Sequence, residues 1–151
     1  MKRIIINLCL IAIAFSLITC REKETKLNSY VSIIEIPATD MNRAIDFYQS
    51  ILGIKIEKLD FPEYPDMQLG LLPQEGQQVV GVLIKGDGYA PSSKGVTVYL
   101  NAGENLQAIV ENIPKQGGKV LVPKSPHADG VGFYAIFLDT EGNRLGLHSP
   151  N

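Results

Sequence analysis

The sequence is poor in cysteine, histidine and tryptophan. Of its 151 residues two are cysteine, two are histidine and none is tryptophan. Both cysteines, Cys9 and Cys20, lie in the N-terminal segment, so the remainder of the chain can form neither a disulfide nor a catalytic thiolate. Two histidines exclude a metal site built from three. The chain also lacks the G-x-S-x-G sequence that carries the serine nucleophile of one large class of hydrolases.

An excess of charge of either sign is missing as well. Fourteen basic and 16 acidic residues give a formal net charge of -2, and no run of like charges stands out. Because binding to the phosphate backbone needs clustered Lys and Arg, we expect no nucleic-acid partner. The chain is 45% hydrophobic, which suits one folded domain with a core of its own.

The N-terminus reads as a targeting segment. A short cationic start, residues 1–3, precedes an apolar run over 4–18. That run is typical of a signal peptide and short for a membrane-spanning helix, which needs roughly 20 residues. It ends in Leu-Ile-Thr-Cys at 17–20, which resembles a bacterial lipobox.

We therefore predict a lipoprotein. Residues 1–19 would be the signal peptide, Cys20 the lipidated residue and 20–29 a polar, flexible tether. The protein would be held by its lipids in a bacterial cell envelope, at the outer face of the inner membrane or on the outer membrane. The alternative is an uncleaved membrane anchor.

The rest of the sequence contains an internal repeat of about 65 residues, the sign of a duplicated structural unit. A strand-like run over 30–36 leads into a helix-like run ending at Gly53, and a run over 96–101 leads into one ending near Gly117 and Gly118. Each unit reads strand-helix-strand-strand-strand. The further strands are expected over 54–58, 67–72, 79–84, 119–122, 131–138 and 144–148. The domain over 30–148 thus divides into module one (30–84), a linker (85–95) and module two (96–148).

Four local signals place element ends. Asp40 is a suitable N-cap for the first helix, and Gly53 can end that helix because glycine readily adopts the left-handed conformation. Pro114 lacks an amide donor and should end or kink the second helix early. Residues 139–143 (Asp-Thr-Glu-Gly-Asn) should form the turn between the last two strands, with Gly142 taking positive φ.

Two phrases carry a family resemblance. Residues 44–48 (Ala-Ile-Asp-Phe-Tyr), with Leu-Gly at 52–53, and residues 137–143 (Phe-Leu-Asp-Thr-Glu-Gly-Asn) resemble the vicinal oxygen chelate superfamily of glyoxalase I, bleomycin-resistance proteins and extradiol dioxygenases. The resemblance covers 30–148. It implies an α+β fold of two βαβββ modules whose curled mixed sheet forms a cup, usually within a homodimer.

The resemblance also implies where metal ligands would stand, on the first and last strands of each module. Those positions hold Ile33, Thr97, Gly146 and an apolar stretch around Val82. None of these side chains is a His or a Glu. We therefore predict no metal and no other cofactor, with a divalent metal disfavoured.

Two polar residues lie close to the vacated positions. Glu35 and His148 are each displaced by two residues, so they face the same side of their strands as the missing ligands. We predict them as a catalytic pair that meets in the cup, within one chain or across a dimer. The alternative is that Glu35 pairs with a cation or a backbone donor and that His148 only packs or is solvated.

Three further residues are candidates for binding a ligand. Tyr99 is displaced by two from Thr97, and both could face the cup. His127 lies in the loop 125–130, which could cover the pocket or leave the histidine exposed. Arg144, directly after the turn, is more often a surface charge than a clamp for an anion.

Three functions fit these observations. The first is binding of a small organic molecule, with metal-independent acid-base chemistry of the lyase or isomerase type. The second is a metal-dependent enzyme of the glyoxalase or dioxygenase type. The third is a non-catalytic protein that sequesters a ligand, as drug-resistance relatives do.

Overall fold

The computed structural model describes residues 29–128 and 130–151. The predicted signal peptide, Cys20 and all but the last residue of the tether lie outside these ranges. Within them, no helix is both long enough and apolar enough to cross a membrane.

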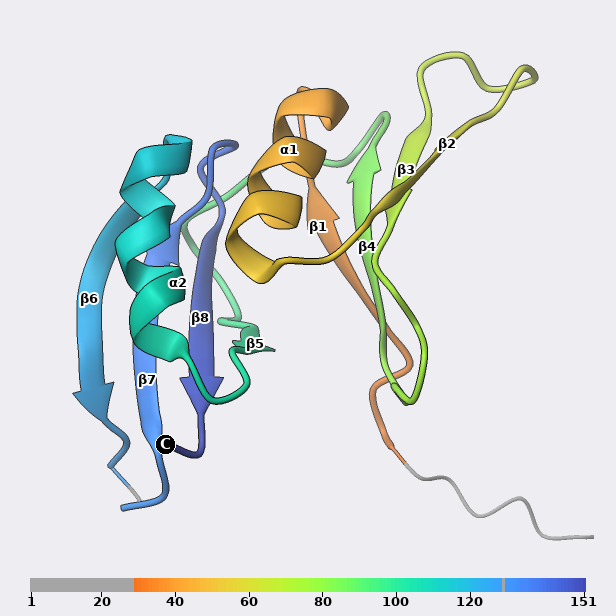
Figure 1. The fold of residues 1–151 in the computed structure, drawn as a ribbon. Coiled ribbons are helices and arrows are strands. Elements are labelled where there is room, and N and C mark those ends of the chain that lie inside the picture. The colour runs from red at the N-terminus through yellow and green to blue at the C-terminus, as the bar shows by residue number, and fades with distance from the viewer. Residues whose placement is uncertain (1–28, 129) are drawn as a thin grey trace, which may run out of the picture.

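Module one forms a four-stranded sheet with one helix on its face (Figure 1). The strand order is β1-β4-β3-β2, with β1 parallel to β4 and the other pairs antiparallel. Its elements are β1 (Ile33–Pro37), α1 (Met41–Leu52), β2 (Glu57–Asp60), β3 (Gln68–Leu71) and β4 (Val80–Lys85).

Module two repeats this topology. Its strand order is β5-β8-β7-β6, again with the first and last strands parallel. The predicted βαβββ duplication is therefore confirmed, although the two sheets remain separate and do not close into one. The elements are β5 (Tyr99–Asn101), α2 (Leu106–Asn112), the 3₁₀ helix η1 (Ile113–Gln116), β6 (Lys119–Pro126), β7 (Phe133–Leu138) and β8 (Arg144–Ser149).

The helix ends follow the local chemistry. The Asp40 side chain caps α1 by accepting from the amide of Arg43 at 3.1 Å, and Gly53 stops the helix at φ 65°. The second helix ends at Asn112, as Pro114 predicts, because proline lacks the amide donor and the chain tightens into η1.

Four strands miss their predicted bounds by three residues or more: β1, β2 and β5 each begin three residues late, and β6 ends four residues late. β5 is only three residues long, although residues before it also bond to β8: Gly146 N donates to Val98 O (2.8 Å) and Arg144 N to Ser92 O (3.2 Å). β6 extends to Pro126 with two register shifts against β7. Such irregularities bend a strand, so β6 follows its neighbour further than the predicted 119–122.

One hydrophobic core joins both modules. Helix α1 lies between the two sheets, and α2 covers the second (Figure 1). The Phe47 ring of α1 lies 6.2 Å from the Phe137 ring of β7. Each sheet therefore has an inner face against the helices and an opposite face, called here the open face. Ile36 is buried on the inner side of β1, whereas Ile33 is 57% exposed on the open side.

Candidate functional site

The open face of the second sheet gathers the polar and aromatic side chains of module two. Leu145 and Leu147 of β8 are buried in the core, so the alternating residues Arg144, Gly146 and His148 face the other way. On β7, Tyr134 pairs in register with His148, and Ile136 with Gly146.

Four aromatic side chains meet on this face. Tyr99, His127, Tyr134 and His148 form a chain of edge-to-face contacts, called here the aromatic cluster. The ring centroids of Tyr99 and Tyr134 are 6.5 Å apart, those of His127 and Tyr134 5.8 Å, and those of His127 and His148 5.7 Å. Edge-to-face packing is the arrangement that aromatic quadrupoles favour.

A cavity of about 400 Å³ opens beside the aromatic cluster. This volume lies within the range of small-molecule sites, and the mixed aromatic, aliphatic and cationic lining is of the kind that such sites use. We call it the binding cavity. It is lined by Tyr99, Val122, Pro126, His127, Ala128, Tyr134, Ile136 and Arg144.

Gly146 makes room for the cluster. The ring of Tyr99 lies so close to the Gly146 backbone that a Cβ atom there would collide with it. Tyr99 and Gly146 are also paired in register across β5 and β8. At position 146, where the resemblance places a metal-ligating Glu, the ring of Tyr99 therefore packs on the glycine backbone.

Arg144 lies at the other end of the binding cavity. Its Nη1 donates to the Thr97 hydroxyl, and its side chain is half-buried. No carboxylate among residues 29–128 and 130–151 forms an ion pair with it. Arg144 is thus a partly exposed charge that also belongs to the face of β8 lining the cavity.

Glu35 lies elsewhere. It is exposed on β1, and its carboxylate makes no hydrogen bond or ion pair with the described part of the chain. It lines a second cavity, of about 170 Å³, between β1, the linker and the start of β8. The structure therefore brings Thr97, Tyr99, His127 and His148 to one face but not Glu35. A meeting of Glu35 and His148 across a dimer remains a prediction.

A metal centre of the kind that the resemblance implies would need donor side chains on the first and last strands of both sheets. The positions that the resemblance assigns to ligands hold Ile33, Val82, Thr97 and Gly146. Within the described ranges, no three His, Cys, Asp or Glu side chains come together in a way that could hold a metal ion. The side chains present do not fit a metal centre of the kind that the resemblance implies.

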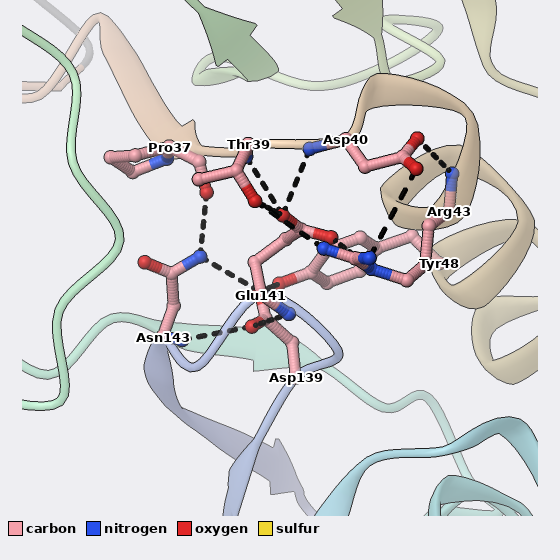
Figure 2. A network of polar contacts seen from close by, with 8 residues as sticks. All are labelled: Pro37, Thr39, Asp40, Arg43, Tyr48, Asp139, Glu141 and Asn143. Atoms are coloured by element: carbon pink, nitrogen blue, oxygen red, sulfur yellow. Dashed lines mark hydrogen bonds and ion pairs between the residues drawn. The ribbon is translucent and has the colours of Figure 1, made fainter.

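The family-like phrases instead build a joint between the modules (Figure 2). Glu141, in the turn between β7 and β8, accepts from the amide and the hydroxyl of Thr39, both at 2.7 Å, and from the amide of Asp40 at 3.1 Å. Its other oxygen accepts from Arg43 Nε at 2.7 Å. Burial alone would raise the pKa of Glu141, but hydrogen bonds from Arg43 and Thr39 outweigh it and lower the pKa.

The same turn reaches the core through Asp139. Its carboxylate accepts from the Tyr48 hydroxyl at 2.7 Å and from Asn143 Nδ2 at 2.9 Å, and Asn143 Nδ2 also donates to Pro37 O at 2.7 Å (Figure 2). Burial, followed by the nearby Asp139 charge, raises the pKa of Tyr48 well above its usual value of 10.0. These residues hold the modules together and do not line the binding cavity.

The sequence-based predictions indicated neither Tyr134 as part of the site nor the place of Arg144 beside the cavity. A signal for Tyr134 was present, because pairing the strands outward from the turn at 139–143 sets Leu138 against Arg144 and Tyr134 against His148. The position of Arg144 beside a cavity depends on β6 and on the residues before β5, which no local pattern indicates.

Comparison with known proteins identifies the family. A family model described as the Glyoxalase/Bleomycin resistance protein/Dioxygenase superfamily matches residues 27–147. A glyoxylase-like domain-containing protein of Didymella fabae is 35% identical over 122 residues, or 78% of this chain and 91% of that protein. Lactoylglutathione lyase GLX1 of Arabidopsis thaliana is 29% identical over 115 residues, or 72% of this chain and 40% of the plant enzyme.

Solved structures agree on the fold. Glyoxalase I from Zea mays matches with a TM-score of 0.62 at 25% identity, over 78% of this chain and 45% of the maize chain. TnmS3, an antibiotic binding protein from a Streptomyces species, matches with a TM-score of 0.59 at 24% identity, over 82% of this chain and 97% of that chain. This chain thus spans less than half the length of the plant enzymes that it matches. It belongs to the glyoxalase, bleomycin resistance protein and dioxygenase superfamily.

Proposed function

We propose that the protein binds a small organic molecule in the binding cavity, with a planar part of the ligand packed against the aromatic cluster. The observation that carries this proposal is the chain of ring contacts from Tyr99 through Tyr134 and His127 to His148 beside a cavity of about 400 Å³. Aromatic rings supply large apolar contact areas and favour the stacking of planar groups.

The relatives support this kind of role from two sides. One solved structure is named an antibiotic binding protein, which fits a ligand-sequestering role. Lactoylglutathione lyase is an enzyme, which fits a catalytic one. Binding is common to both, so we place it first.

We propose that binding needs no metal. The lack of a suitable donor group among the described residues supports this part of the proposal. A metal-dependent enzyme of the glyoxalase or dioxygenase type is the competing function. Tight stoichiometric metal binding, after chelation and reconstitution of the protein, would favour it instead.

Acid-base chemistry is a second candidate function and depends on a homodimer. On the open face of the first sheet, Ile33 is 57% exposed and pairs with half-buried Val80, and half-buried Leu71 lies on the same face two strands away. Covering these apolar side chains with a second copy would also bury Glu35, which shares their face. In such a dimer Glu35 of one copy and His148 of the other could exchange protons with a ligand, as in a lyase or an isomerase.

We further propose that Cys20 carries a lipid anchor in the bacterial cell envelope. The support is the sequence pattern that ends at this residue. Cys20→Ser should release the protein from the membrane fraction, whereas Cys9→Ser should not. Membrane retention of both variants would favour an uncleaved anchor.

The test of the proposed binding uses 2-naphthamide, a neutral planar probe, titrated into the purified protein by calorimetry. The wild type should bind it, and Tyr134→Ala should weaken binding several-fold, because one aromatic contact contributes about 0.5–1.5 kcal/mol beyond its buried area. Tyr64→Ala, at an exposed tyrosine outside the cavity, is the matched control. No detectable binding by the wild type would refute the proposal.

A further inference from the structure

The guanidinium of Arg144 has no carboxylate partner among the described residues. Its Nη1 donates to the Thr97 hydroxyl, which leaves most of the five guanidinium donors for other acceptors. It is half-buried beside the binding cavity, and no described carboxylate forms an ion pair with it. A guanidinium stays charged at any physiological pH, so a partly desolvated one gains from an anion.

The charges around Arg144 do not prevent it from binding an anion. Glu35 and Lys94 line the smaller neighbouring cavity together with Arg144, and their charges offset one another. The side chains that line the binding cavity itself include no carboxylate. The net charge of the whole chain is -2, so any preference for an anion must arise locally and not from the overall field.

The spacing along β8 sets the shape of a suitable ligand. Arg144 and His148 are four residues apart on one face, which is about 13 Å at the usual rise of a strand. Between them Gly146 carries no side chain, and the Tyr99 ring lies across it. A molecule that reaches from the rings to the guanidinium would have a planar body and a charged group at one end.

We propose that the binding cavity takes planar organic acids, with Arg144 binding the carboxylate and the aromatic cluster packing against the ring system. A single guanidinium balances a single negative charge, and its planar fork matches the two oxygens of a carboxylate. Thr97 holds the guanidinium in place and acts as a positioning residue. This inference rests on the proposed function, whose ligand class it specifies.

The test compares 2-naphthoate with 2-naphthamide, which share a ring system and differ in charge. We expect the wild type to bind the acid roughly 10-fold or more tightly than the amide, as a charge-assisted hydrogen bond implies. Arg144→Gln should abolish this preference, because it should weaken binding of the acid about 10-fold more than binding of the amide. Lys115→Gln makes the same charge change at an exposed site on η1 and should keep the preference.

The outcomes separate the two proposals. If the wild type binds both probes equally, or Arg144→Gln keeps the preference, the inference is wrong while the proposed binding stands. If the wild type binds neither probe, both fail. Should Arg144→Gln not fold, Arg144→Lys takes its place, because it keeps the charge but loses the planar fork. If Arg144→Lys loses affinity several-fold for 2-naphthoate alone, the inference is supported. If its affinity for both probes is unchanged, the inference is overturned.

Discussion

The Tyr48 hydroxyl donates a 2.7 Å hydrogen bond to the Asp139 carboxylate, which lies 91 residues away in the sequence. The bond crosses from α1 to the end of the β7–β8 hairpin and so ties module one to module two. Its two residues belong to the two phrases by which the sequence resembles its family. What those phrases specify in this chain is the joint between the modules.

Tyr48→Phe should lower the free energy of unfolding by about 1–3 kcal/mol, because it removes one partner of a buried carboxylate. Tyr48 is fully buried, so water cannot replace the lost donor. Tyr64→Phe removes a hydroxyl from a tyrosine that is 63% exposed and should change stability by less than about 0.5 kcal/mol. Urea unfolding measures both. Equal stability of the two variants would show that the Tyr48 bond adds nothing.

Glu141 should make stability depend on acidic pH. Its folded pKa is lowered from an ordinary 4.5, so its contribution is complete above that value and is lost as the pH falls through the folded pKa. Glu141→Gln should therefore be less stable than the wild type at neutral pH, and the difference should shrink below about pH 4.5.

The control for this experiment is Glu104→Gln, at an exposed carboxylate before α2. It should stay close to the wild type across the same pH range. A constant difference between wild type and Glu141→Gln from pH 7 to pH 3 would contradict the assigned role of the Glu141 carboxylate.

Gly146→Ala should disturb the aromatic cluster and spare the fold. The added methyl group collides with the Tyr99 ring, which is exposed enough to swing into solvent. We expect several-fold weaker binding of 2-naphthamide in calorimetry. Gly86→Ala is the matched control, since its methyl group would meet only ordinary contacts and its φ is not positive. If Gly146→Ala bound the probe as well as Gly86→Ala does, the ring of Tyr99 would not be part of the site.

Glu35 and His148 can be tested as a pair by a double-mutant cycle on 2-naphthamide affinity. If they meet across a dimer, Glu35→Gln and His148→Ala should each weaken binding, and the double variant should lose less than the sum of the two. Sedimentation of the same samples reports the oligomeric state. Strictly additive effects would mean that the two side chains do not interact, and no effect of Glu35→Gln would mean that Glu35 takes no part in the site.

Much of the fold could be predicted from the sequence because the ends of several elements depend on residues that are neighbours in the chain. The capping Asp40, the glycine at 53 and the proline at 114 act on their own neighbours, and the structure confirms all three. The bounds of β5 and β6 depend instead on how far each strand stays paired with β8 or β7. Such pairing is tertiary, so the predicted bounds were wrong there.

The candidate site was predictable only in part for the same reason. Alternation along β8 placed His148 and the vacant Gly146 on one face, and Tyr99 followed from the repeat. The separation of Glu35 from these residues follows from the two sheets remaining apart, with the linker between β1 and β8. No pattern within a single module contains that information.

The most direct test of the account is a titration of 2-naphthamide into EDTA-treated, isotope-labelled protein, followed by the backbone amide signals in NMR. If the probe binds as proposed, saturable shifts should appear at Tyr99, His127, Tyr134 and Arg144, with none around the cavity of the first sheet formed by 55–58 and 71–74. Shifts confined to the first sheet, or binding that appears only after a divalent metal is added, would contradict it.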